Sequence, residues 1–146
     1  MGMKPYRKII ATMALILLGG VCNEVAAKAK CTKIYAYGFS ASFNDSIVYF
    51  TDIQEIDSAW INEKNKFLIS RENYSFQLKN YFNGLGQEHR TCVISYALER
   101  KDIEKKYQKM KNKYVKAGNF SIKYIDSNDF RFKAIKPDDY ELNQLK

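Results

Sequence analysis

Apolar and small or polar residues alternate through residues 33–43, and this period of two predicts a β-strand. The aromatic residues of this segment all fall on one side of it: Tyr35, Tyr37, Phe39 and Phe43. Asn44 and Asp45 follow, and both residue types favour turns because they tolerate left-handed backbone conformations. The next stretch, 47–53, is again rich in β-formers. We therefore predict a β-hairpin made by 33–43 and 47–53.

Two later segments show the helical period. Within 71–83, apolar residues recur three and four positions apart, and Ser70 precedes the segment as a candidate N-cap. The segment 99–117 shows the same spacing in Ile103, Tyr107, Met110 and Tyr114. Both segments end at glycines, which favour helix termination. These patterns predict two amphipathic helices, each with one apolar stripe.

The remaining apolar stretches predict strands. Residues 90–98 are rich in β-formers and mostly apolar, as is typical of a central strand. Residues 120–124 and 130–134 both alternate, and the polar turn 126–129 lies between them, which predicts a closing hairpin. Residues 66–69 are a further short strand candidate.

The predicted order is β-β-(β)-α-β-α-β-β, with 66–69 as the bracketed strand. An aromatic fraction of 14% provides ample apolar surface for a core, which excludes a disordered chain. Two striped helices and at least five strands favour an α+β fold with a mostly antiparallel sheet. We expect a single two-layer domain over 30–136, with both helices on one face of the sheet. A polar C-terminal tail follows at 137–146.

The chain begins with the pattern of a cleavable secretory signal. Lys4, Arg7 and Lys8 form a positive segment, an uncharged apolar stretch follows, and small residues within 25–29 offer cleavage sites. The apolar run is 14 residues long, whereas a membrane-spanning helix needs roughly 18–20. We therefore predict that residues 1–29 are a signal peptide and that the protein is exported, to the periplasm or the extracellular space.

An alternative within the export hypothesis is a lipid anchor at Cys22, at the end of the apolar run. The lipoprotein pattern has a small residue just before the acylated cysteine and a large aliphatic residue three positions before it. This chain has Val21 and Gly19 at those positions, which fit poorly. Membrane attachment is therefore expected only in this less favoured case.

Two cysteines remain after cleavage, Cys31 and Cys92. Export would place them where disulfides persist. A bridge between them would close a loop of about 60 residues, which is worth about 4 kcal/mol in the chain-entropy model. We favour this bridge, and the alternative is two unpaired thiols with Cys92 in a strand.

Candidate catalytic residues are few. His89, the only histidine, lies three positions before Cys92, but a thiol–imidazole pair needs a free thiol, which export disfavours. Asp52, Glu55 and Asp57 form an acidic cluster that could divide acid and base roles in glycoside hydrolysis. Surface carboxylates are common, however. The sequence has neither the spacing of a metal site nor a glycine-rich phosphate loop, so no metal or cofactor is predicted.

The helix predicted at 99–117 is strongly basic. From Arg100 to Lys116 it carries eight basic and two acidic residues, a net charge of 8 − 2 = +6. Helical geometry places four lysines opposite the apolar stripe. This lysine row is Lys101, Lys105, Lys109 and Lys116. A solvated helix face explains the row, and so does a docking surface for an anionic envelope component or an acidic protein. Nucleic acid is not expected, because an exported protein rarely meets it.

These patterns favour a small, non-catalytic binding or interaction protein of the cell envelope or extracellular space. The lysine row is its expected contact surface. The alternative is a small secreted hydrolase, or an inhibitor of one. The enzyme would require His89 or the acidic cluster to converge on a cleft.

Overall fold

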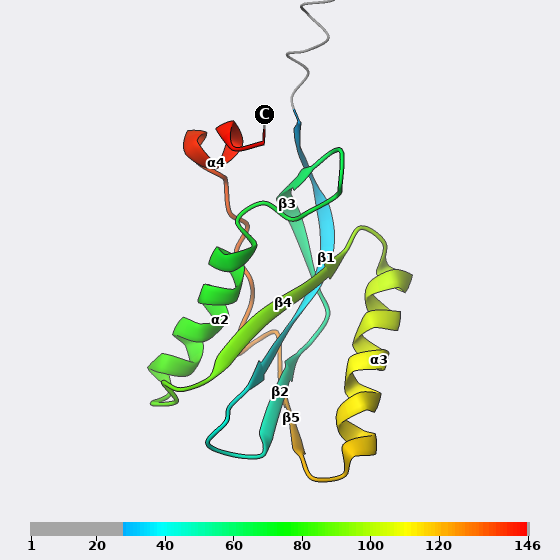
Figure 1. The fold of residues 1–146 in the computed structure, drawn as a ribbon, viewed down its shortest axis with the longest axis vertical. Helices are drawn as coiled ribbons and strands as arrows, with labels where there is room; N and C mark the ends of the chain where they lie inside the picture. Colours follow the sequence, from blue (N-terminus) through cyan, green and yellow to red (C-terminus); the bar gives the residue numbers. More distant parts are fainter. Residues whose placement is uncertain (1–27, 146) are drawn as a thin grey trace, which may run out of the picture.

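The structure, a computed structural model, describes residues 28–145. The predicted signal peptide up to residue 27, with the alternative anchor site Cys22, lies outside the described residues. Figure 1 shows the helices and strands in space. Along the chain they are β1 (Ala29–Ala41), β2 (Ile47–Thr51), β3 (Gln54–Asn62), α2 (Arg71–Gly84), β4 (Thr91–Ala97), α3 (Arg100–Ala117), β5 (Ser121–Ile125) and α4 (Asp139–Asn143).

The long strand β1 organises a five-stranded sheet. Its first part pairs with β3 and its second part with β4, both antiparallel. β2 also pairs antiparallel with β1, with Phe39 opposite Phe50, so the predicted first hairpin is confirmed. β5 is the exception, because it runs parallel to β2. The α+β class, the mostly antiparallel sheet and the order of elements up to β5 match the sequence prediction. The third strand, however, is Gln54–Asn62 and not 66–69, where Leu68 makes only an isolated bridge to Ile61.

The two long helices lie on opposite faces of the sheet, with α2 on one side and α3 on the other (Figure 1). Successive residues of a strand point to opposite faces. Tyr37 of β1 packs against Tyr107 of α3, with ring centroids 5.1 Å apart. The next residue, Gly38, faces α2, where a Cβ atom would lie 2.7 Å from Leu78 Cδ2. The expectation that both helices share one face is therefore corrected.

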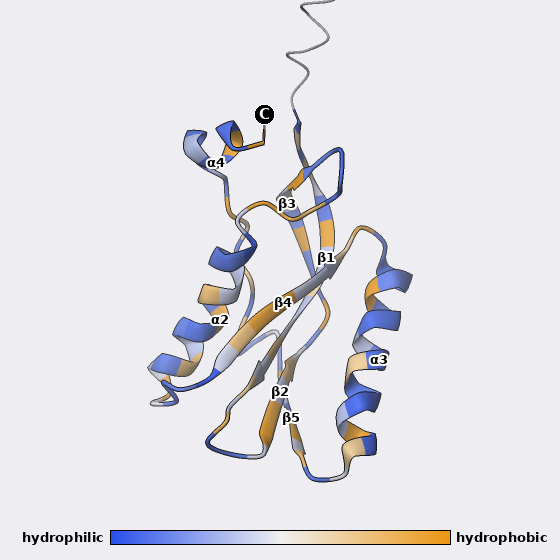
Figure 2. Cartoon of the chain, viewed as in Figure 1, coloured by the Kyte–Doolittle hydropathy of each residue, from blue (hydrophilic) through white to orange (hydrophobic). Residues whose placement is uncertain are grey.

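The physical reason is that β1 is apolar on both faces. Ile34 and Ala36 are fully buried on the α2 side, while Tyr37 and Phe39 are buried on the α3 side. A strand with two apolar faces needs cover on both of them, so each helix covers one face. In Figure 2, α3 is mostly hydrophilic with apolar residues recurring along it, whereas β2 is largely apolar.

The predicted closing hairpin does not form, because β5 pairs with β2 and the segment after it has no regular structure. Side chains take the place of a strand partner. The buried Gln54 amide accepts a hydrogen bond from Phe132 N–H at 2.8 Å and donates one to Phe130 O at 2.9 Å. Gln77 of α2 bonds both backbone groups of Lys133 in the same way, each at 2.9 Å. The apolar rings of this segment thus reach the core without a ladder of backbone bonds.

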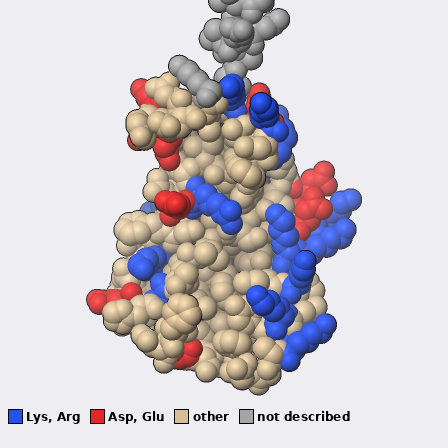
Figure 3. All heavy atoms as spheres, viewed as in Figure 1, with Lys and Arg blue, Asp and Glu red and all other residues tan. Residues whose placement is uncertain are grey.

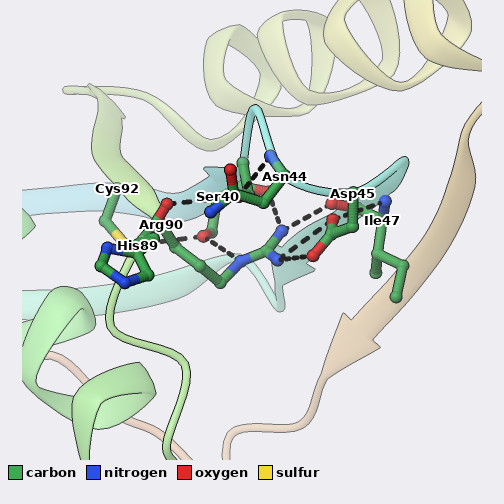
Figure 4. A network of polar contacts seen from close by, with 8 residues as sticks. Ser40, Asn44, Asp45, Ile47, His89, Arg90 and Cys92 are labelled. Atoms are coloured by element: carbon green, nitrogen blue, oxygen red, sulfur yellow. Dashed lines mark hydrogen bonds and ion pairs between the residues drawn. The ribbon is translucent and has the colours of Figure 1, made fainter.

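A buried arginine connects the start of β4 to the first hairpin (Figure 4). Arg90 is only 3% exposed. Its Nε donates to Ser40 Oγ at 2.9 Å, Nη1 pairs with Asp45 at 3.2 Å, and Nη2 donates to Ile47 O. The guanidinium carbon lies 4.7 Å from the centroid of the Tyr49 ring. These contacts fix the hairpin end of β1 and β2 against β4.

The C-terminal segment, predicted to be a polar tail, contains the short helix α4. Asp138 and Glu141 form a capping box at its start. The Ser70 hydroxyl donates to the Glu141 carboxylate at 2.8 Å, which ties α4 to the beginning of α2. Among the helices of residues 28–145, none is both long and apolar enough to span a bilayer.

The partly buried Tyr107 in the core on the α3 side predicts that the fold is sensitive to alkaline pH. Burial raises the pKa of Tyr107 to about 12, whereas an unfolded chain has a tyrosine pKa of about 10. The folded state therefore keeps this proton more tightly, and its contribution to stability is lost as pH rises from about 10 to 12. We expect the melting temperature to fall over this range, and to fall less in a Tyr107→Phe variant. An equal fall in both proteins would contradict this, and Tyr140→Phe, at an exposed position, is the control.

Candidate functional site

The lysine row lies along the solvent side of α3, where all four side chains are exposed. Within the described part of the chain, none of the four makes an ion pair or a side-chain hydrogen bond. The ion pair on this helix joins Arg100 to Glu104 at 3.1 Å. Figure 3 shows Lys and Arg atoms gathered on the side of the molecule where α3 lies. The row is therefore a set of positive charges without compensating partners.

The other three lysines of α3 have contacts within the domain. Lys106 donates to Tyr96 O at 2.8 Å, Lys111 lies over the Tyr124 ring at 5.3 Å, and Lys113 lies near the ring of Tyr114 at 5.8 Å. Lys111 thus leans toward β5, while Lys106 reaches β4. The charge of α3 is therefore spread from its solvent side to the side that faces β4.

A strip of the sheet beside α3 is left uncovered. A packed helix is about 10 Å wide and neighbouring strands are about 4.8 Å apart, so one helix covers about two strands. α3 lies over β1 and β2, where Phe39 and Phe50 contact its tyrosines. Val93 of β4 is opposite Phe39 and points to the same face, yet it is 42% exposed.

Two hollows of about 450 and 340 Å³ lie along this strip, and a third, of about 600 Å³, opens at its start and extends round the end of β4 to Phe67 and Arg71 beside α2. From the start of α3 to its end, the three hollows are flanked by Ala97 and Lys106, by Tyr37 and Met110, and by Thr91 and Tyr114. The first two share Lys106. We name this strip, between β4 and the side of α3 that carries Lys106, Lys109 and Lys113, the α3 groove. Sequence reasoning missed it, because the groove exists only if α3 is alone on its face.

The predicted disulfide is not present, because Cys31 and Cys92 are both free. In the sheet, Cys31 lies opposite Trp60, whereas Cys92 lies opposite Ser40. Cys31 and Ser40 are 40 − 31 = 9 residues apart on β1, a separation of roughly 30 Å along a strand. A disulfide needs Cα atoms within about 7 Å. The bridge was favoured only by export and cysteine number, and neither constrains strand register.

His89 and Cys92 do not form a catalytic pair. The His89 side chain is exposed. The backbone carbonyl of His89, and not its imidazole, accepts a hydrogen bond from Ser42 Oγ at 3.2 Å. Cys92 Sγ instead donates to Ser40 Oγ at 3.5 Å (Figure 4). Burial raises the pKa of the Cys92 thiol, and the bond to Ser40 opposes this only in part. A thiol held protonated in this way is a poor nucleophile.

The acidic cluster divides into two separate surface contacts. Asp52 accepts hydrogen bonds from the Ser127 N–H at 3.0 Å and from its hydroxyl at 2.9 Å, which stabilises the turn after β5. Glu55 and Asp57 both lie near Lys33, at 3.6 and 3.9 Å. All three carboxylates are exposed. Their contacts are those of a solvated sheet edge.

Within residues 28–145, no three His, Cys, Asp or Glu side chains are grouped so that they could hold a metal ion.

No protein-family model matches the chain, and no curated protein or solved structure is significantly similar to it. The charge and shape of α3 and its groove are therefore the features from which function can be inferred.

Proposed function

We propose that this protein is a small exported, non-catalytic binding protein that attaches to an anionic partner through the lysine row of α3. The partner is an anionic component of the cell envelope or an acidic protein. The observation that carries the proposal is a set of four exposed ammonium groups without ion pairs to the described residues, on a helix with a net charge of +6.

The spacing of the row suits an extended anionic surface. Lys101, Lys105 and Lys109 follow one another at intervals of four residues, which is about 6 Å along a helix axis. The distance from Lys101 to Lys116 is about 22 Å by the same geometry. Lysine ammonium groups attract anions as point charges and lack the fixed fork of arginine. Binding is therefore expected to be multivalent and strongly salt-dependent.

The row also has a cost in stability. Like charges four residues apart on a helix destabilise it by about 0.2–0.5 kcal/mol per pair. The row contains two such pairs, Lys101–Lys105 and Lys105–Lys109, and they gain no compensating contact within the described chain. Because these repulsive pairs destabilise the helix without a compensating contact, they support a role of the row in binding rather than in folding.

The non-catalytic part of the proposal is supported by where the candidate catalytic groups lie. The acidic cluster is split between Ser127 and Lys33, and the Cys92 thiol bonds Ser40. The alternative, a small secreted hydrolase or hydrolase inhibitor, has less support because its enzymatic form needs these groups to converge.

Charge reversal tests the proposal. The natural protein is mixed with isolated cell envelopes at low and high salt, and the bound fraction is measured by sedimentation. The mass of the same protein shows whether residues 1–29 have been removed. We expect binding at low salt, loss at high salt, and at least about tenfold weaker binding when the row is reversed. The test variant carries Lys101→Glu, Lys105→Glu, Lys109→Glu and Lys116→Glu.

The matched control reverses four exposed lysines elsewhere, so that the change in net charge is identical: Lys30→Glu, Lys64→Glu, Lys123→Glu and Lys133→Glu. It is expected to bind nearly as well as the unmodified protein, and both variants should keep its circular dichroism spectrum. Equal weakening in both variants would show that net charge matters and the row does not. Salt-independent binding would contradict the proposal outright.

A further inference from the structure

The α3 groove combines exposed apolar surface with a basic wall, which the lysine row alone does not. Val93 is 42% exposed and Leu98 is 38% exposed at its β4 side. Met110 and the largely buried Tyr37 line its middle hollow, between Lys106 and Lys113. A partner that was only charged would leave this apolar surface in water.

We infer that the α3 groove binds an acidic amphipathic helix of a partner protein. The inference rests on the proposed function and names the chemistry of the partner. Helices that pack side by side on a sheet lie about 10 Å apart. On its face α3 leaves β4 uncovered except at the end of the strand, where Ala97 is buried in the same core cluster as Ile103. Since β4 pairs only with β1 among the described strands, a further helix beside α3 would pack on β4 and extend beyond the free edge of the sheet.

The length of the groove agrees when measured along either wall. From Thr91 to Ala97 of β4 there are six residue steps, or about 20 Å. From Asp102 to Tyr114 of α3 there are twelve, or about 18 Å. A helix of three to four turns fills this length.

Charge complementarity sets the sign of the partner. Lys106, Lys109 and Lys113 are spaced by three and four residues along the wall, so they project on one side of α3. Asp102 is the acidic residue among those that line the first two hollows. A facing helix with carboxylates three and four positions apart could pair with these lysines, as flanking charges do in paired helices.

The chain's own ends fit the groove poorly. The first 27 residues carry Lys4, Arg7 and Lys8 and a single acid, Glu24, so their charge has the same sign as the wall. α4 is acidic but only five residues long, and Glu141 is bound to Ser70. A separate partner is therefore the better occupant.

Selection from a displayed library of random 16-residue peptides tests the inference directly, because any acidic amphipathic helix can then compete for the groove. We expect the enriched peptides to be net negative, with apolar residues three and four positions apart. Their affinity is expected to fall at least about fivefold in a Val93→Gln variant, which removes exposed apolar surface from the groove without changing charge. Val115→Gln is the matched control, because Val115 is an exposed valine on the solvent side of α3.

The results of the selection and of the two valine variants separate the possible uses of the α3 groove. Enriched acidic amphipathic peptides that are sensitive to Val93→Gln and insensitive to Val115→Gln support the inference. No enrichment, peptides without acidic residues, or equal sensitivity to both variants would overturn it. Self-association of the protein that Val93→Gln abolishes, measured by sedimentation, would also overturn it by assigning the groove to a second copy. If these tests fail while envelope binding still depends on the lysine row, the groove inference falls and the proposed function stands.

Discussion

Replacing Arg90 with methionine is expected to lower the free energy of unfolding by about 3 kcal/mol. Methionine keeps much of the buried volume but cannot donate a hydrogen bond. Ser40 and Ile47 would then lose donors to their oxygens at a position where Arg90 is only 3% exposed. Buried acceptors without partners account for most of the expected loss, which chemical denaturation would measure.

Two further variants separate the contacts of Arg90. Arg90→Lys keeps the charge but loses the planar fork, so it should recover only part of the stability. Asp45→Asn should cost less than about 1 kcal/mol, because Asp45 is 41% exposed and water screens its ion pair. If Asp45→Asn cost as much as Arg90→Met, the ion pair and not the backbone contacts would be the main source of stability.

Replacing Gln54 with leucine is expected to cost about 2–3 kcal/mol and to loosen the segment after β5. The Gln54 amide satisfies Phe130 O and Phe132 N–H, and leucine of similar size can satisfy neither. Hydrogen exchange should therefore accelerate at the Phe132 amide in the variant, along with the loss of stability measured by denaturation.

Gln77→Leu is the matched control for Gln54→Leu. Gln77 makes an equivalent pair of bonds to Lys133, but these bonds are exposed, so water can replace them and the expected cost is below about 1 kcal/mol. Equal costs for the two variants, or an unchanged exchange rate at Phe132 in Gln54→Leu, would show that the segment is held by ring packing alone.

The elements with a regular period could be predicted from the sequence. The alternation of 33–43 and the stripes of the two long helices are local properties, and the structure has β1, α2 and α3 at these places. β3 was missed for a local reason. Buried and exposed residues alternate along β3 except at Asp57 and Ser58, which are consecutive and both exposed. There, two residues of β3 oppose the single residue Lys33 of β1, as in a β-bulge.

The arrangement of layers could not be predicted from the helices themselves. An apolar stripe shows that a helix is covered, but it does not show which face of the sheet covers it. The signal lay in β1, where Ile34 and Ala36 alternate with Tyr35 and Tyr37, so that both faces are apolar. That error also concealed the α3 groove, which depends on β4 extending beyond a single helix.

The lysine row could be predicted because helical geometry alone places its four residues on one side. Lys106 and Lys113 lie outside this row. Their place on the wall of a groove follows from tertiary packing, since it depends on where α3 lies relative to β4.

Mapping the contact surface by nuclear magnetic resonance examines the role of α3 most directly. Isotope-labelled protein is titrated with poly-glutamate, and the shifts of the backbone amides are followed. Binding through the basic face predicts shifts concentrated in α3 and in β4 beside it, which disappear in high salt. Shifts centred on α2, or on the turn around Asp52 and Ser127, would show that anions bind elsewhere and that the lysines of α3 are only a solvated surface.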